Sequence, residues 1–169
     1  PQDAFPIILT QLINLLGVEC ALVDLLSPSG QEIEAVSALG VWASVTGLRT
    51  PVDGGVSGCV ISTGQPYITT DLAADGLVAR PDLVYGVKAV ACVPIVALHR
   101  PIGTLWIGRQ GEAIITGEEV KLLSALGEML GNTIQRMKLH EQTVIQAEQI
   151  TSAYDLTLEG WAKALELRD

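Results

Sequence analysis

The distribution of proline is the feature that most limits how this chain can fold. All eight prolines lie at or before Pro101, so the remainder of the chain has no proline to break a helix. Thr116 and Glu119 have the spacing of a capping box, which marks a helix start. We therefore expect one long helix, whose second half extends beyond the folded domain and needs a partner helix. Its apolar residues recur about every 3.5 positions, at Leu123, Leu126, Leu130, Ile134, Met137, Val144, Ala147, Tyr154, Leu158, Trp161 and Leu165.

The chain before this helix has the pattern of a small mixed domain. Apolar residues at helical spacing predict an opening helix, and paired apolar runs around turn sequences predict antiparallel hairpins. This order predicts an α+β fold with a central antiparallel sheet, in which the last hairpin, the most apolar, lies centrally. The expected elements are a helix at 3–16, a hairpin of 20–26 and 32–39, a short helix at 56–63, a strand at 67–69, an irregular segment at 71–86, and a hairpin of 89–97 and 102–108 joined by residues 98–101.

Composition and charge exclude several classes of protein. Hydrophobic residues make up 49% of the 169 residues and charged residues only 17%, which excludes a disordered chain. The formal net charge of -9 opposes binding to the phosphates of nucleic acid. Before Arg100 the only basic residues are Arg49, Arg80 and Lys88, so no basic stripe is available for a membrane surface.

The cysteines and the apolar runs indicate a cytoplasmic protein. Cys20, Cys59 and Cys92 are odd in number and far apart, which favours reduced thiols. The longest apolar stretch, residues 87–98, is far shorter than the roughly 20 residues that cross a bilayer. No signal peptide opens the sequence, and Pro1 in place of Met suggests an excised fragment.

A run in the middle of the chain combines a glycine-rich turn, a short helix and a Thr-Gly-x-Pro step into a strand. Residues 52–67 read VDGGVSGCVISTGQPY, with Asp71 following. This pattern resembles that of the GAF family of sensory domains, whose fold is PAS-like. Residues 93–95 and 101–105 are similar to the family's central hairpin. The resemblance covers about residues 5–139 and implies a ligand-binding domain at residues 1–139.

The end of the chain resembles a second family. Residues 153–169 are similar to the lead helix of HD-GYP phosphohydrolases, which resemble cyclic di-GMP phosphodiesterases in their activity. The resemblance implies that residues 140–169 form a coiled-coil stalk and the start of such an output domain, which depends on a metal. The metal-binding residues of that family are expected after Asp169. The alternative is that Leu158, Trp161 and Leu165 only continue a coiled coil.

The residues of this chain do not form a recognisable catalytic site. A nucleophilic triad needs a base within hydrogen-bond reach, and the only histidines, His99 and His140, fall in a hairpin turn and in the helix. No Cys or His pair has the spacing of metal ligands. Free methionine sulfoxide reductases also resemble GAF domains, but Cys92 lies in an unbroken apolar strand, where we expect no nearby acid and a disfavoured thiolate. We expect no catalysis by this chain.

The resemblance places a noncovalent pocket between the sheet, the short helix and the irregular segment. Cyclic-nucleotide members of the family share a residue set that includes a phenylalanine, whereas the only phenylalanine here is Phe5 in the opening helix. Bilin-binding members attach the chromophore to a cysteine beside a histidine, and no cysteine here has a neighbouring histidine. The two histidines are also poorly placed to ligate haem. The sequence names no ligand or cofactor. Val56 and Ser57 are carried over from the family's pocket-facing turn, while Asp71, Arg80 and Tyr85 are candidates because a site needs a few polar groups in an apolar cavity.

Together these patterns predict a sensory domain whose small-molecule ligand controls a downstream HD-GYP-like output domain through a dimeric helix. The first alternative is a dimerisation platform with a filled pocket, which tight packing of Trp42, Tyr67 and Trp106 would favour. The second is a free methionine sulfoxide reductase that uses Cys59 and Cys92. We also expect Gly127 and Gly131, four residues apart in the exit helix, to allow close packing against the sheet.

Overall fold

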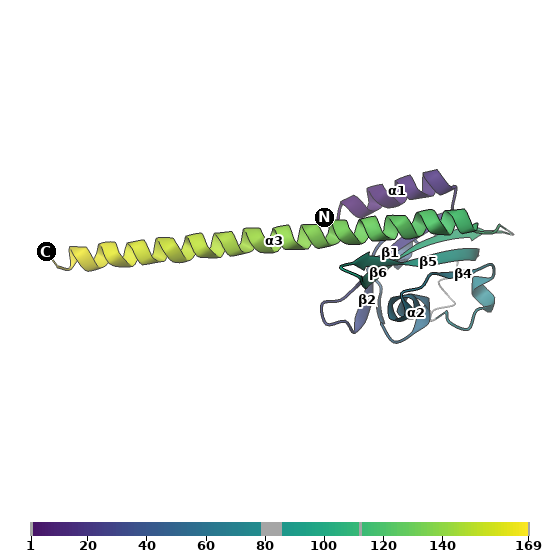
Figure 1. Cartoon of the computed structure of the whole chain (residues 1–169), viewed down its shortest axis with the longest axis horizontal. Helices are drawn as coiled ribbons and strands as arrows, with labels where there is room; N and C mark the ends of the chain where they lie inside the picture. Colours follow the sequence, from purple (N-terminus) through teal and green to yellow (C-terminus); the bar gives the residue numbers. More distant parts are fainter. Residues whose placement is uncertain (1, 79–85, 112, 169) are drawn as a thin grey trace. The chain divides into compact units, whose positions relative to one another are not determined.

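The computed structural model describes residues 2–78, 86–111 and 113–168. These form two compact units, Pro1–Thr133 and Ile134–Asp169. The first unit contains the sheet, the shorter helices and the beginning of the last helix (Figure 1). Helix α3, Gly117–Glu166, continues from the first unit into the second.

The first unit is built on a six-stranded sheet in which every neighbouring pair is antiparallel, which confirms the predicted α+β fold. The strand order is β3-β2-β1-β6-β5-β4. Strands β1 and β6 are therefore central, whereas β5 lies between β6 and the edge strand β4. The strands are β1 (Cys20–Leu26), β2 (Glu32–Gly40), β3 (Arg49–Pro51), β4 (Tyr67–Thr69), β5 (Val87–Ala97) and β6 (Arg100–Gln110).

Helices cover both faces of this sheet, which explains why its central strands are apolar on both sides. Helix α1, Ala4–Leu16, lies on the same face as the start of α3, and helix α2, Gly55–Thr63, lies on the opposite face (Figure 1). The short 3-10 helices η1, Ala43–Val45, and η2, Leu72–Ala74, connect the strands. Both helices end at a glycine in the left-handed conformation, Gly17 with φ of 61° and Gly64 with φ of 67°.

Close contact between α3 and β5 depends on two glycines, as predicted. A Cβ atom on Gly131 would lie 2.0 Å from the carbonyl oxygen of Val96, and one on Gly127 would lie 2.6 Å from that of Pro94. Both distances are far inside van der Waals contact. The absence of side chains at these two positions lets the helix backbone approach the strand directly.

The turn between β5 and β6 is shorter than the predicted connection of residues 98–101. Only Leu98 and His99 lie outside the two strands, and both have positive φ, 51° and 62°. Positive φ at both central residues matches the twist of a two-residue hairpin turn. Arg100 and Pro101 instead pair with Ala97 and Val96.

The start of α3 is fixed by the predicted capping box and by an ion pair. Thr116 and Glu119 exchange hydrogen bonds, with 3.0 Å between the Thr116 amide and Glu119 Oε1 and 3.2 Å between the Glu119 amide and Thr116 Oγ1. Arg109 on β6 donates to both carboxylate oxygens of Glu119, at 2.8 and 2.5 Å, and to the carbonyl of Leu16 at the end of α1. One guanidinium thus joins a strand to two helices.

We expect Glu119→Gln to destabilise the first unit in a pH-dependent way. The hydrogen bonds from Arg109 are the main cause that lowers the pKa of Glu119 from 4.5 to about 2. A carboxyl with a depressed folded-state pKa stabilises the protein above its unfolded pKa, and this contribution is lost as the pH falls through the folded value. Urea unfolding at neutral pH should show a loss of about 1 to 2 kcal/mol, which disappears between about pH 4.5 and pH 2.

The exposed neighbour Glu118 provides the control, and Glu118→Gln should change the free energy of unfolding by less than about 0.5 kcal/mol. A Glu119→Gln deficit that stays constant down to pH 2 would show that the charge of Glu119 is not the source of the stabilisation.

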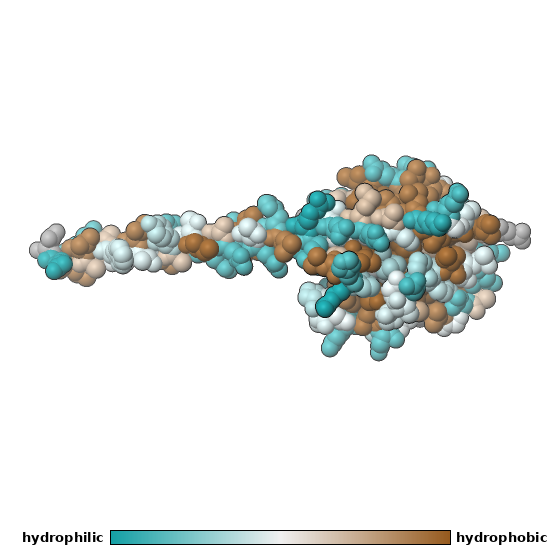
Figure 2. All heavy atoms as spheres, in the orientation of Figure 1, coloured by the Kyte–Doolittle hydropathy of each residue, from teal (hydrophilic) through white to brown (hydrophobic). Residues whose placement is uncertain are grey.

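The second unit consists of the continuation of α3. Its described side chains from residue 136 to residue 168 are exposed, and hydrophobic residues recur among the polar ones on its surface (Figure 2). No helix in the described ranges is both long enough and apolar enough to span a membrane.

Candidate functional site

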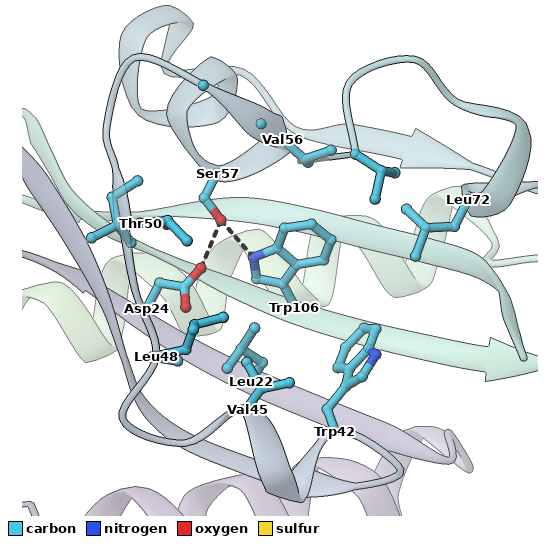
Figure 3. A pocket seen from close by; sticks show the side chains of 15 residues that line it. Leu22, Asp24, Trp42, Val45, Leu48, Thr50, Val56, Ser57, Leu72 and Trp106 are labelled. Carbon is cyan, nitrogen blue, oxygen red and sulfur yellow. Dashed lines mark hydrogen bonds between the residues drawn. The ribbon is translucent and has the colours of Figure 1, made fainter. Parts of the chain in front are cut away.

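A cavity lies on the face of the sheet that α2 covers (Figure 3). Its volume is about 140 Å³, and its walls come from β1, β2, β3, β6, η1, η2 and the first turn of α2. Most of the lining is apolar, with a small polar group on one side. The apolar lining residues are Leu22, Ile33, Ala35, Trp42, Val45, Leu48, Val56, Leu72, Val78 and Trp106; the others are Asp24, Thr50, Gly54, Gly55 and Ser57.

The polar group is placed by the register of the two central strands. Asp24 on β1 lies opposite Thr104 on β6, and Leu22 lies opposite Trp106. Because alternate residues of a strand share one face, all four side chains belong to the face that carries the cavity. Asp24 is only 7% exposed, although it is a carboxylic acid in an otherwise apolar strand.

A compact hydrogen-bond network holds the carboxylate. Ser57 Oγ donates to Asp24 Oδ2 at 2.6 Å, and Thr104 Oγ1 donates to the same oxygen at 3.1 Å. The indole N–H of Trp106 is shared between the two hydroxyl oxygens, at 3.0 and 3.1 Å. The network therefore runs from Trp106 through the two hydroxyls to one oxygen of Asp24, and it joins α2 to both central strands.

The electrostatics of Asp24 are dominated by its removal from water. Burial raises its pKa above the ordinary value, and the hydrogen bonds from Ser57, Thr104 and Trp106 oppose that rise without cancelling it. No positively charged residue is found among the described residues that line the cavity. Within the described part of the chain, the carboxyl is thus stabilised by neutral dipoles.

Two tryptophans form the aromatic part of the lining. The rings of Trp42 and Trp106 pack edge to face, with centroids 5.9 Å apart and an interplanar angle of 86°. Tyr67 packs against the buried cluster beside Trp106, and its hydroxyl donates to Asp75 Oδ2. The aromatic residues therefore pack against one another and still leave the cavity open.

The first turn of α2 reaches the cavity without a side-chain cap. Gly54, the residue before the helix, has an extended backbone and offers no side chain to the first N–H groups. Gly58 allows the helix to approach the preceding segment, since a Cβ there would lie 2.2 Å from the carbonyl oxygen of Val52. The glycine-rich turn thus brings Val56 and Ser57 close to the sheet.

The predicted site residues are distributed unevenly around this cavity. Val56 and Ser57 line it, and Ser57 belongs to the hydrogen-bond network. Asp71 is exposed, is not among the lining residues, and instead caps η2 by accepting a hydrogen bond from the Ala74 amide at 3.3 Å. Arg80 and Tyr85 lie outside the described residues. Sequence reasoning missed Asp24 and Thr104.

Cys20 and Cys92 are buried free thiols in surroundings that disfavour the thiolate. Burial is the main cause that raises the pKa of Cys92 well above its ordinary value, and the nearby Asp24 carboxyl adds to the rise. The expectation that no acid lies near Cys92 is therefore wrong, because Asp24 is close to it in the structure. The nearby carboxyl disfavours the thiolate further. Burial also raises the pKa of Cys20 to about 12. Within the described ranges, no group of three or more His, Cys, Asp or Glu residues could hold a metal ion.

Comparison with solved structures identifies many similar folds. The GAF domain of a phosphoenolpyruvate-protein phosphotransferase from Coxiella burnetii is 18% identical with a TM-score of 0.76, covering 83% of this chain and 86% of that one. A GAF domain/HD domain protein from Geobacter sulfurreducens is 16% identical with a TM-score of 0.72, covering 82% and 94%. The type II free methionine-R-sulfoxide reductase from Thermoplasma acidophilum is 13% identical with a TM-score of 0.66, covering 77% and 89%.

At these identities the likeness concerns the fold alone, and no curated protein matches the sequence. The family model of the GAF domain, however, matches residues 1–134, which is most of the chain and includes the whole of the first compact unit. The sheet order, the covering helices and the site on the α2 face are all contained in this matched region. The chain therefore belongs to the GAF domain family.

Proposed function

We propose that this chain is a sensory module that binds a small molecule in the cavity beneath α2 and passes the signal along α3 to an output domain. The observation that carries this proposal is a cavity of about 140 Å³ with a buried carboxyl on its wall. Buried polar groups that face an apolar cavity are costly unless a partner satisfies them, so their presence favours a binding site over a packing defect.

The size of the cavity limits the ligand. An apolar cavity of about 150 Å³ holds a molecule the size of benzene, and the volume here is about 140 Å³. We therefore propose a ligand of about one ring. A bilin, a haem or a cyclic nucleotide is larger than this volume. The positions of the phenylalanine, cysteine and histidine residues in the sequence disfavour the same three ligands.

We further propose that the output is an HD-GYP-like phosphohydrolase domain that follows α3 and acts on cyclic di-GMP. Two observations support this part: residues 153–169 resemble the lead helix of that family, and a similar fold occurs in a GAF domain/HD domain protein. The metal and its ligands would belong to that following domain, and the proposed roles of this chain are sensing in the cytoplasm and pairing of two copies through α3.

Two alternatives remain beside this proposal. A dimerisation platform without a ligand is favoured by the edge-to-face packing of Trp42 and Trp106, but the residual cavity is an argument against it. A methionine sulfoxide reductase has a similar fold, but the raised pKa of Cys92 opposes the thiolate that such chemistry requires. Turnover of free methionine sulfoxide by the purified chain would favour the reductase.

The proposal is tested by filling the cavity. Thr50 lies on the edge strand β3, is partly exposed and lines the cavity, so Thr50→Trp can occupy the space with little strain on the core. We expect native mass spectrometry of the protein purified from its own cells to show a bound small molecule, and Thr50→Trp to abolish it. Arg49→Trp is the matched control, because adjacent strand residues face opposite sides.

The control variant should retain the bound molecule, since Arg49 lies outside the lining and its exposed ion pair with Glu34 contributes little. Two results together would favour the dimerisation platform. The wild type would carry no small molecule, and its unfolding temperature, measured in cell extract, would equal that of Thr50→Trp.

A further inference from the structure

The Asp24 carboxyl has one satisfied oxygen and one that receives no hydrogen bond. Both hydroxyl donors, Ser57 and Thr104, reach Oδ2, and Oδ1 receives no hydrogen bond from the described residues. No fully buried side-chain oxygen or nitrogen in the described ranges lacks a partner, so Oδ1 must retain some exposed surface. Since Asp24 is 93% buried and lines the cavity, that surface faces the cavity.

The charge around this oxygen is one-sided. The cavity lining includes one carboxylic acid and, in the described part of the chain, no basic residue. The first turn of α2 presents unpaired N–H groups, but a helix N-terminus is equivalent to about half a positive charge. Burial raises the pKa of Asp24, and a cation beside Oδ1 would favour the ionised carboxylate again. The full negative charge of that carboxylate outweighs the half charge of the helix end, so the site favours a cation over an anion.

We infer that the cavity takes a small single-ring cation whose N–H group donates a hydrogen bond to Asp24 Oδ1, with its ring against Trp42 and Trp106. This inference rests on the proposed function, because it names the class of ligand for the same site. Suitable chemistry includes aminopyridinium, imidazolium and benzylammonium groups.

Three features of the site agree with this class of ligand. A single ring matches a volume of about 140 Å³. Tryptophan is the best aromatic partner for a cation, and two indole rings line the cavity. The net charge of -9 raises the local concentration of small cations around the whole protein.

The experiment compares two near-isosteric probes by isothermal titration calorimetry at neutral pH. 4-Aminopyridine is a cation under these conditions, and aniline is neutral with a ring and an amino group of similar size. A charge-assisted hydrogen bond should make the cation bind about tenfold more tightly than aniline, or better. Benzoate serves as the anionic probe and should not bind measurably.

Two variants separate the carboxyl from the cavity. Asp24→Asn keeps an oxygen to accept from Ser57 and Thr104 but removes the charge, and it should abolish the preference for the cation while aniline affinity changes less than about threefold. Thr50→Trp should abolish binding of both probes. Thermal unfolding of each variant shows whether it is folded. If Asp24→Asn does not fold, the relative affinities of the wild type for 4-aminopyridine, aniline and benzoate still test the inferred ligand class.

The possible failures of the two proposals differ. If neither probe binds the wild type, the inferred ligand class is wrong, and native mass spectrometry of the protein from its own cells decides separately whether the cavity binds another small molecule. If both probes bind but Thr50→Trp leaves their binding unchanged, they bind outside the cavity and the inferred ligand class is also wrong. If aniline or benzoate binds as tightly as 4-aminopyridine, or if Asp24→Asn keeps the preference for the cation, the cavity binds small molecules but the inferred ligand class is wrong.

Discussion

Gly131→Ala should destabilise the GAF domain by at least about 3 kcal/mol, although it adds a single methyl group to a helix. A Cβ at this position would lie 2.0 Å from the carbonyl oxygen of Val96 and 2.9 Å from its amide nitrogen. The obstacle is the backbone of a paired strand, which cannot rotate away as a flexible side chain can. Helix α3 must therefore shift away from β5, and this shift removes packing along the interface between them.

The matched control is the same substitution in the same helix. Gly160 has no atom within 4 Å of its Cβ position, so Gly160→Ala should only improve helix propensity, by about 1 kcal/mol. Thermal unfolding should show a loss of about 10 °C for Gly131→Ala and no loss for Gly160→Ala. If both variants unfold at the wild-type temperature, the close approach of α3 to β5 is not needed for stability.

This packing connects the proposed binding site to the beginning of α3 within the first unit. The pocket face of β6 carries Thr104 and Trp106, while Leu105 between them points to the other face, where α3 begins. Because tightly packed interiors transmit displacements rather than absorb them, a ligand that moves Asp24 or Trp106 also moves the strand beneath α3. Gly127 and Gly131 place the backbone of α3 directly against β5, so we expect the helix to respond to a small movement of the sheet.

Most of the fold was predictable because its signals are local. The hairpins and the first two helices follow from apolar periodicity and from glycine stops that lie within each segment. Strand β3 has no such pattern: Arg49–Pro51 is a strand only because it pairs with β2. The turn between β5 and β6 was predicted at the right place but two residues too long, because the sequence does not show that Leu98 and His99 both take a positive φ.

The site was harder to predict because its residues come from distant parts of the chain. Val56 and Ser57 were found through a local motif, but their partners Asp24, Thr104 and Trp106 are brought to them by strand register. The sequence did contain one signal, an aspartate inside the apolar strand β1. Burying a single acid among apolar strand residues costs free energy, and such a residue is therefore a candidate for a binding site.

Replacing Leu158 and Leu165 with aspartate should convert the proposed dimer to monomers. In the second unit the apolar residues of α3 are exposed, with Val144 at 42%, Leu158 at 47% and Leu165 at 64%. They recur at heptad spacing together with Tyr154 and Trp161. A helix with such a seam is stable in water when a second helix covers it, and a parallel pair would place two following domains side by side.

The expected effect is large because each substitution acts in both copies. Burying one leucine contributes about 1.5 to 3 kcal/mol, so removing two from each helix should weaken the dimer more than about a thousandfold. Sedimentation at micromolar concentration should show dimers for the wild type and monomers for Leu158→Asp with Leu165→Asp. Repulsion among the new carboxylates acts in the same direction, and it is stronger at low salt.

The control adds the same charge to the opposite side of the helix. Gln142 and Gln149 lie at heptad positions that point away from the seam, so Gln142→Asp with Gln149→Asp should remain dimeric. This pair carries the same unfavourable helix propensity of aspartate, which separates loss of the seam from loss of helix. If the wild type sediments as a monomer, or if both double variants remain dimers, the contact between copies does not lie along this seam.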